Sequence, residues 1–168
     1  IVEPEVLELI PEGEKFDWSR QVFPAMLENG MALRGSTISG IWFDIGRASD
    51  LLKAQKVIIS EQEQLWTTLP PGMFGDVGFN SPVAKIDGKS IDSVVLDDCK
   101  IKTNSLVQNS LVMANTIVSE DCSIISSIIG SDTVIEKGVK LVDCVIGDGM
   151  VVEAFSQWQG IRYPDDTS

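Results

Sequence analysis

Few side chains in this sequence have the chemistry that catalysis or metal binding needs. The 168 residues include three cysteines and no histidine. Histidine is the commonest general base near neutral pH and the commonest metal ligand, so its absence removes most acid–base and zinc chemistry. Cys99, Cys122 and Cys144 are separated by 23 and 22 residues, which fits no zinc-binding pattern. We therefore predict that the cysteines are small buried residues in a reducing compartment.

The overall charge excludes further classes of partner. The formal net charge is −12, and proteins that bind nucleic acid do so through an excess of Lys and Arg. No apolar run approaches the ~18 residues that span a bilayer, and no signal peptide is visible. We expect a cytoplasmic protein that binds neither nucleic acid nor membrane. Because the chain begins with Ile1 and not methionine, we also expect it to be a piece of a longer protein.

The first part of the chain mixes helical and strand patterns. Residues 18–28 have apolar side chains at helical spacing, and residues 32–43 suggest one or two strands. Residues 49–65 form the strongest helical pattern, and Ser49 or Asp50 could cap its N-terminus. Residues 66–92 are rich in Pro and Gly, which predicts a linker or an irregular first coil.

Residues 93–158 follow a period of 17 residues. Aliphatic residues recur at steps of six, six and five positions, and a tryptophan extends the series. A second aliphatic column and a column of Ser and Cys repeat with the same period. The eleven aliphatic positions of the first column are Val95, Ile101, Val107, Val112, Val118, Ile124, Ile129, Ile135, Leu141, Ile146 and Val152; the second column is Val94, Leu111, Ile128 and Val145, and the third is Ser93, Ser110, Ser127 and Cys144.

Three short faces in each 17-residue repeat describe a triangular coil. Stacked coils form parallel strands ~4.8 Å apart, and each inward aliphatic residue lies on the one 17 residues earlier. Turn residues such as Asp98, Asn115 and Asp132 recur at one corner. No segment leaves room for a crossover helix, which excludes a βαβ sheet. We predict a mainly β fold with a parallel β-helix over 93–158 and a tail over 159–168, the whole preceded by an α+β segment.

This pattern resembles the hexapeptide-repeat left-handed β-helix, and the left hand is implied by that resemblance alone. Many members of that family are acyltransferases with a catalytic histidine, and some are carbonic anhydrases with three histidines on a metal. The absence of histidine removes both chemistries here, although an acyltransferase with another base stays open. Oligomerisation and regulatory contact are the remaining uses of such a domain.

Residues 1–65 resemble the end of the catalytic domain of sugar-phosphate nucleotidyltransferases, the NDP-sugar pyrophosphorylases of the mannose-1-phosphate guanylyltransferase and glucose-1-phosphate thymidylyltransferase type. A β-helix after that domain is the usual order in this family. The resemblance implies a fragment of an enzyme that joins a nucleoside triphosphate and a sugar 1-phosphate. The motifs that carry it are Glu3-Pro4-Glu5-Val6-Leu7, Phe16-Asp17 with Phe23-Pro24, Gly40 with Trp42-Phe43-Asp44-Ile45-Gly46, and Leu52-Lys53-Ala54.

The family resemblance implies one site residue. In these enzymes the Asp of W-x-D-x-G binds Mg²⁺, and here that residue is Asp44. The ion neutralises the charge of two reacting anions. The alternative is that Asp44 only caps the following helix. Glu3 and Asp17 are expected to be structural. The family's Gly-rich phosphate loop is not present in the sequence, so we expect this fragment alone to be inactive.

Three functions stay open at this point. The first is the C-terminal portion of an active nucleotidyltransferase, with the β-helix serving oligomerisation or regulation. The second is a non-catalytic β-helix that assembles or regulates a pyrophosphorylase-like protein. The third is an acyltransferase with another base. Open coil ends and flat faces favour self-association, so a homo-oligomer is expected in the first two.

Overall fold

The computed structural model describes residues 1–61, 72 and 78–164, and it divides into two compact units. Unit 1 comprises Ile1–Ser39 and unit 2 comprises Gly40–Ser168. The segment 40–61 therefore belongs with the β-helix and not with residues 1–39. The two units are described separately below.

Unit 1 is a small helical cluster. It contains a 3₁₀ helix η1 (Pro4–Leu9), a π-helical turn η2 (Trp18–Val22) and helix α1 (Phe23–Glu28). Val6, Val22 and Met26 form its core. Asp17 starts the helical stretch, because its Oδ1 accepts the Arg20 N–H at 2.8 Å. The helix predicted over 18–28 and the structural role of Asp17 are confirmed.

The strand prediction for 32–43 is wrong. This segment is described throughout and contains no strand. A strand needs a neighbour with which to exchange backbone hydrogen bonds, and no described segment pairs with these residues.

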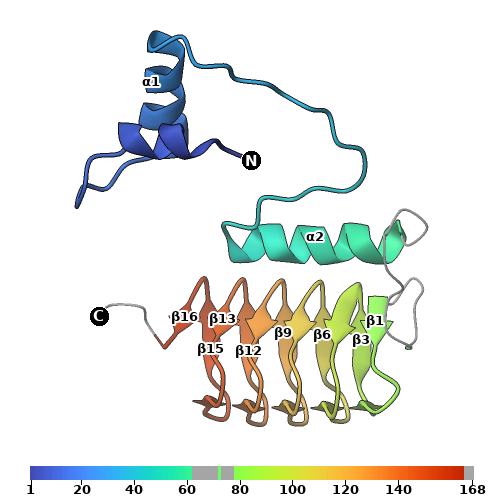
Figure 1. The fold of residues 1–168 in the computed structure, drawn as a ribbon. Helices are drawn as coiled ribbons and strands as arrows, with labels where there is room; N and C mark the ends of the chain where they lie inside the picture. The colour runs from blue at the N-terminus through green and yellow to red at the C-terminus, as the bar shows by residue number, and fades with distance from the viewer. Residues whose placement is uncertain (62–71, 73–77, 165–168) are drawn as a thin grey trace. The chain divides into compact units, whose positions relative to one another are not determined.

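Unit 2 consists of helix α2 (Ala48–Ser60) and a parallel β-helix (Figure 1). The strands form three sheets, one on each side of a triangular coil, and about five coils are stacked. Sheet A contains β1 (Gly78–Asn80), β4 (Ser93–Val95), β7 (Leu111–Val112), β10 (Ile128–Ile129), β13 (Val145–Ile146) and β16 (Arg162–Tyr163). Sheet B contains β2 (Lys85–Ile86), β5 (Lys100–Ile101), β8 (Ile117–Val118), β11 (Val134–Ile135) and β14 (Val151–Val152). Sheet C contains β3 (Lys89–Ile91), β6 (Leu106–Gln108), β9 (Ser123–Ile125), β12 (Lys140–Val142) and β15 (Gln157–Gln159).

The inward column is the one that the 17-residue period predicts. All eleven aliphatic anchors are at most 1% exposed. In sheet A, Ile129 pairs with Val112 on one side and with Ile146 on the other. Trp158 pairs with Leu141 as the period predicts, but the stack continues one strand further, because Tyr163 of β16 pairs with Ile146 within the segment predicted as a tail. The β-helix prediction is confirmed, while its left hand remains an implication of the family resemblance.

The corners and the third column explain why the coils stack so regularly. At one corner the φ angles of Asp98, Asn115 and Asp132 are 57°, 60° and 56°, a region that Asp and Asn tolerate better than other side chains. Beside another corner, hydroxyl groups link successive coils. The Ser110 N–H donates to the Ser93 Oγ at 3.1 Å, and the Ser127 N–H donates to the Ser110 Oγ at 3.0 Å. Buried backbone groups that the sheets leave unpaired are thereby satisfied.

The first coil, built from β1, β2 and β3, departs from the 17-residue spacing. Gly78 pairs with Ser93, 15 residues later, whereas Lys89 pairs with Leu106, 17 residues later. The coil is therefore two residues shorter between β2 and β3. Its inward positions include polar Asn80. These three strands lie within 66–92, the region for which the sequence suggested a linker or an irregular coil.

Helix α2 covers the outer face of sheet A. Leu52 packs with Leu111 and Ile128, which are 8% and 6% exposed although they point away from the β-helix interior. The helix is confirmed from residue 48 to 60, and residues 62–65 of the prediction lie outside the described residues. The cap prediction is wrong: the N-cap is Arg47, which makes no side-chain cap hydrogen bond, and Asp50 lies inside the first turn. A carboxylate there still favours the helix dipole.

Candidate functional site

Asp44 is exposed on a segment without helix or strand just before α2. It is not the helix cap, because Arg47 holds that position, so the structural alternative for Asp44 is not observed. Gly46 does not have the positive φ that would make glycine necessary there. No three His, Cys, Asp or Glu side chains of residues 1–61, 72 and 78–164 lie close enough together to hold a metal ion. Asp44 alone therefore supplies a single carboxylate and does not form a magnesium site.

The β-helix nevertheless fixes the position of α2, the helix that follows the segment containing Asp44. Besides the apolar contact, the Gln55 side chain donates from Nε2 to the Ser110 carbonyl at 3.2 Å. Lys56 forms an ion pair with Asp92 at 3.7 Å. The helix is thus attached both to sheet A and to the turn before β4, and Asp44 lies four residues before it. A rigid support of this kind is what a positioned ligand needs.

The three cysteines have no reactive setting. All are free and buried, as the sequence predicted. The Cys122 thiol lies 3.0 Å from the Glu136 carbonyl, and the Cys99 thiol lies 2.9 Å from the Met113 carbonyl. Burial raises the pKa of both thiols, which keeps them protonated and unreactive. They fill the interior of the β-helix and do not act as nucleophiles.

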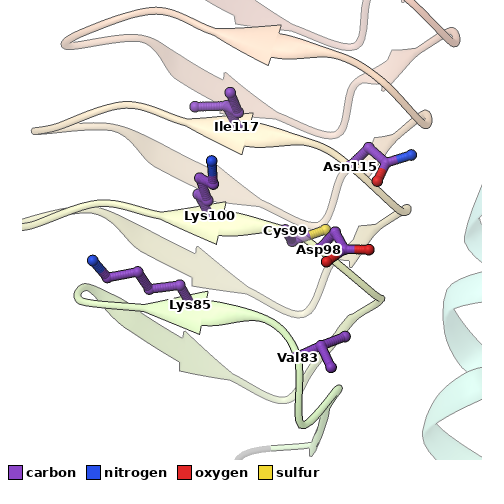
Figure 2. A pocket seen from close by; sticks show the side chains of 7 residues that line it. All are labelled: Val83, Lys85, Asp98, Cys99, Lys100, Asn115 and Ile117. Carbon is purple, nitrogen blue, oxygen red and sulfur yellow. The ribbon is translucent and has the colours of Figure 1, made fainter.

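An open depression of about 290 Å³ lies on the outer surface of sheet B (Figure 2). Lys85 and Lys100 are in register on adjacent strands, and Ile117 follows on the third strand. The lining has no carboxylate pair and no histidine, and burial keeps its one thiol, Cys99, protonated, so nothing in it marks an active site. The residues around the depression are Val83, Lys85, Asp98, Cys99, Lys100, Asn115 and Ile117.

Sequence reasoning missed the surface that α2 covers. Its signal was present as the second aliphatic column, in which Val94, Leu111, Ile128 and Val145 each precede an inward anchor. Consecutive aliphatic residues on a short strand point to opposite faces, so an unbroken aliphatic column on β4, β7, β10 and β13 indicates an outer face that another element covers. The sequence alone therefore predicts this column but not the helix that covers it.

Comparisons with known proteins agree with this architecture. Residues 79–158 match the family model described as GlmU-like, C-terminal hexapeptide. Among curated proteins, the chain is 31% identical over 62 residues to a UTP–glucose-1-phosphate uridylyltransferase of Synechocystis sp.. That alignment covers 37% of this chain and 16% of the relative, so the chain spans a small part of the relative's length.

The two matches and the β-helix fit the C-terminal hexapeptide β-helix of a nucleotidyltransferase, which confirms the family resemblance. The two matches identify the family but not the reaction, because one covers the repeat domain and the other is a short alignment. In the described part of the chain, no helix is both long and apolar enough to span a bilayer.

Proposed function

We propose that this chain, whose β-helix is the hexapeptide domain of a GlmU-like nucleotidyltransferase, is the C-terminal portion of an enzyme that makes NDP-sugars. The enzyme transfers a nucleotidyl group from a nucleoside triphosphate to a sugar 1-phosphate and releases pyrophosphate. The observation that carries the proposal is the order of parts. Trp42-Phe43-Asp44-Ile45-Gly46 leads into α2, and α2 is attached to a hexapeptide β-helix. Among the enzymes of this family, we propose the mannose-1-phosphate guanylyltransferase or glucose-1-phosphate thymidylyltransferase type.

In this proposal two anions react at the α-phosphorus of the triphosphate, and Mg²⁺ would lower the repulsion between them. The residues described here do not suffice to bind that ion, since Asp44 is a lone exposed carboxylate. We therefore assign Asp44 as one Mg²⁺ ligand of the full-length enzyme, whose other ligands lie outside the described residues. The role of the β-helix is to hold α2, and with it the start of the Asp44 segment. By itself the fragment is expected to be inactive.

A measurement on the full-length protein tests the reaction. Pyrophosphate release is followed with each nucleoside triphosphate paired with each common sugar 1-phosphate, with and without Mg²⁺. Asp44→Asn is expected to lower kcat by about 100-fold or more, the usual scale for losing a group that stabilises charge in the transition state. Asp50→Asn is the matched control, because Asp50 lies in the first turn of α2, where it pairs with Lys53 at 3.6 Å, and its loss should leave kcat unchanged. Absence of turnover with every pair contradicts the enzyme proposal.

The second candidate is a non-catalytic β-helix that assembles or regulates a pyrophosphorylase-like protein. It is favoured by the described interior of the β-helix, which consists mainly of aliphatic residues and of hydroxyls that bond to backbone groups, such as Ser110. A full-length protein that oligomerises but never releases pyrophosphate would support it. An acyltransferase is the third candidate, and binding of acetyl-CoA to this chain would support it.

The remaining parts of the proposal concern partners and location. The net charge of −12 argues against a nucleic-acid partner. The free thiols favour the cytoplasm. The proposed partners are thus a nucleoside triphosphate, a sugar 1-phosphate and further copies of the same chain.

A further inference from the structure

The interior of the β-helix changes character in its first coil. In every later coil the three inward positions hold apolar residues, which form one continuous cluster. In the first coil Asn80 pairs with Val95 and Ser90 pairs with Val107, so both polar residues occupy inward positions. The third inward residue of this coil, Ile86, is aliphatic. Asn80 is 9% exposed and Ser90 is 8% exposed, so two buried polar side chains end the apolar column.

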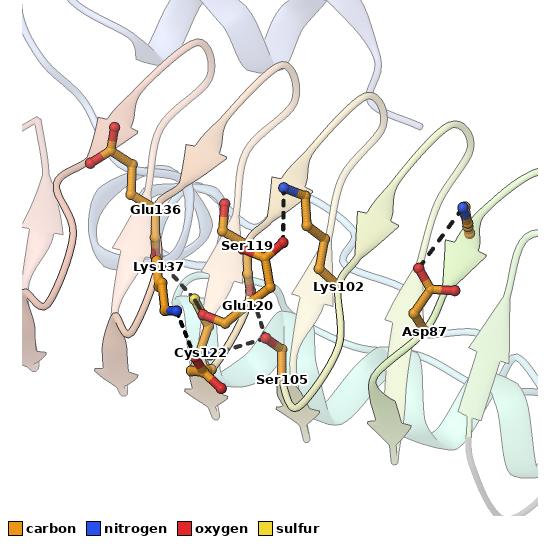
Figure 3. A network of polar contacts seen from close by, with 10 residues as sticks. Asp87, Lys102, Ser105, Ser119, Glu120, Cys122, Glu136 and Lys137 are labelled. Atoms are coloured by element: carbon orange, nitrogen blue, oxygen red, sulfur yellow. Dashed lines mark hydrogen bonds and ion pairs between the residues drawn. The ribbon is translucent and has the colours of Figure 1, made fainter.

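These two residues are the exceptions among the buried polar side chains of the described residues. Figure 3 shows the usual arrangement at Ser105, whose Oγ donates to the Ser119 carbonyl at 2.6 Å and accepts the Cys122 N–H at 3.0 Å. By contrast, Asn80 Oδ1 and Ser90 Oγ are buried and have no hydrogen-bond partner in the described part of the chain. The buried hydroxyls that do have a partner are those of Ser81, Ser93, Ser105, Ser110, Thr116, Ser127 and Thr133.

The two unpartnered oxygens face the same interior space. The inward side chains of one coil converge on its axis, and the first coil is two residues shorter than the others. The strands that carry the two residues, β1 and β3, are close enough to contact each other. A third buried oxygen without a partner among the described residues, Gln55 Oε1, lies on α2 and not inside the β-helix.

The chemistry of the two groups indicates which ligand would satisfy them. A buried polar group without a hydrogen bond costs free energy, and native proteins satisfy such groups with protein atoms or with ordered water. An ion does not fit, because no charged side chain is buried among the described residues of the interior to compensate it. Water fits, since it can donate to an amide oxygen and accept from a hydroxyl at the same time.

We propose that one water molecule is bound inside the first coil and bridges Asn80 and Ser90. The water donates one hydrogen to Asn80 Oδ1 and accepts the hydrogen of the Ser90 hydroxyl. The apolar column therefore ends in a hydrated layer, at a coil whose strand β1 also contacts α2. This inference does not rest on the proposed function, because it concerns only the interior of the β-helix.

A high-resolution crystal structure of this chain tests the site directly. One ordered water is expected within about 3.2 Å of both Asn80 Oδ1 and Ser90 Oγ. A first coil without that water overturns the proposal, and so does a direct hydrogen bond between the two side chains.

The sign of a stability change gives an independent test. Ser90→Ala removes one partner of the water, so the midpoint of urea unfolding should fall by about 0.5 M. If the hydroxyl had no partner, its removal would end the cost of burying it, and the midpoint would rise. Ser123→Ala is the control, because Ser123 lies on the partly exposed outer face of sheet C and its midpoint should change by less than about 0.25 M. A midpoint that rises or stays unchanged in Ser90→Ala contradicts the bound water.

A double variant tests whether the two side chains share one ligand. Asn80→Ala and Ser90→Ala each weaken the same water site, so the midpoint of Asn80→Ala/Ser90→Ala should fall by clearly less than the sum of the two single changes. Circular dichroism before unfolding checks that each variant keeps its β-helix. Additive changes in midpoint would show that Asn80 and Ser90 act independently and would overturn the bridge.

Discussion

Replacing Ser127 by alanine should destabilise the β-helix far more than the loss of one small polar atom suggests. Ser127 is fully buried. Its hydroxyl donates to the Ile125 carbonyl at 2.8 Å and accepts the Cys144 N–H at 3.0 Å. Alanine leaves the Cys144 N–H without this acceptor, in a position that water does not reach. The side chain therefore connects one coil to the next.

The magnitude follows from the groups that lose their partner. Only the Cys144 N–H loses its partner, because the Ile125 carbonyl still accepts the Asp143 N–H at 3.0 Å. A buried donor left unpaired costs about 1–3 kcal/mol, so the substitution should cost about 2 kcal/mol. Urea unfolding followed by circular dichroism measures this change. With a slope of about 2 kcal/mol/M for a unit of this size, the midpoint should fall by about 1 M. Hydrogen exchange should accelerate at the Cys144 amide before it does so two coils away.

Two further variants make this test specific. Ser123→Ala is the control, because Ser123 lies on the partly exposed outer face of sheet C and should change stability by less than about 0.5 kcal/mol. Ser127→Cys should recover part of the loss, since Cys144 continues the same column and its thiol contacts the Val142 carbonyl at 3.3 Å. If Ser127→Ala and Ser123→Ala have equal midpoints, the hydroxyl column does not stabilise the stack.

Two other predictions follow from the packing of the coils. Gly130→Ala should cost about 1–3 kcal/mol of stability through overpacking, because a Cβ would lie 2.6 Å from the Asp148 nitrogen. Gly46→Ala is the control and should leave stability unchanged, since no atom lies within 4 Å of a Cβ at that position. Equal urea midpoints for the two variants would refute this prediction. Burial raises the pKa of Cys99 and Cys122 above the ordinary 9.0, so above pH 9 the unfolded chain loses protons that the folded chain keeps, and stability should fall as the pH rises. The fall between pH 8 and pH 10 should be smaller in Cys99→Ala/Cys122→Ala, and an unchanged slope would show that the thiols do not cause it.

The interior of the β-helix could be predicted from sequence because each position in the stack has the same environment. Any polar residue at an anchor would break a continuous apolar column, so the pattern from Val95 onward is nearly strict. The first coil could not be predicted from the period, because it is two residues shorter than the others and has polar Asn80 paired with Val95. A register that begins at Val95 cannot be extended backward through such a coil.

The candidate site was less predictable. Asp44 was identified only by family resemblance, because one acidic residue in an exposed segment has no pattern of its own. The predicted strands within 32–43 do not form because strand pairing depends on residues elsewhere in a fold. In unit 1, by contrast, the helix beginning at Trp18 depends on local contacts such as the Asp17 cap, and it was found.

The aliphatic column on sheet A connects the fold to the proposed function. At the equivalent outward positions of sheet B, side chains such as Lys100, Ile117 and Val151 stay partly or fully exposed, so the stack by itself does not require Leu111 and Ile128 to be buried. They are instead apolar, buried and matched to Leu52 of the helix that follows Asp44. An apolar stripe of this length is stabilising only when it is covered, at roughly 25 cal/mol per Å² of buried surface. The β-helix sequence thus specifies the position of α2 as well as its own stack, and a support for the Asp44 segment explains why it does so.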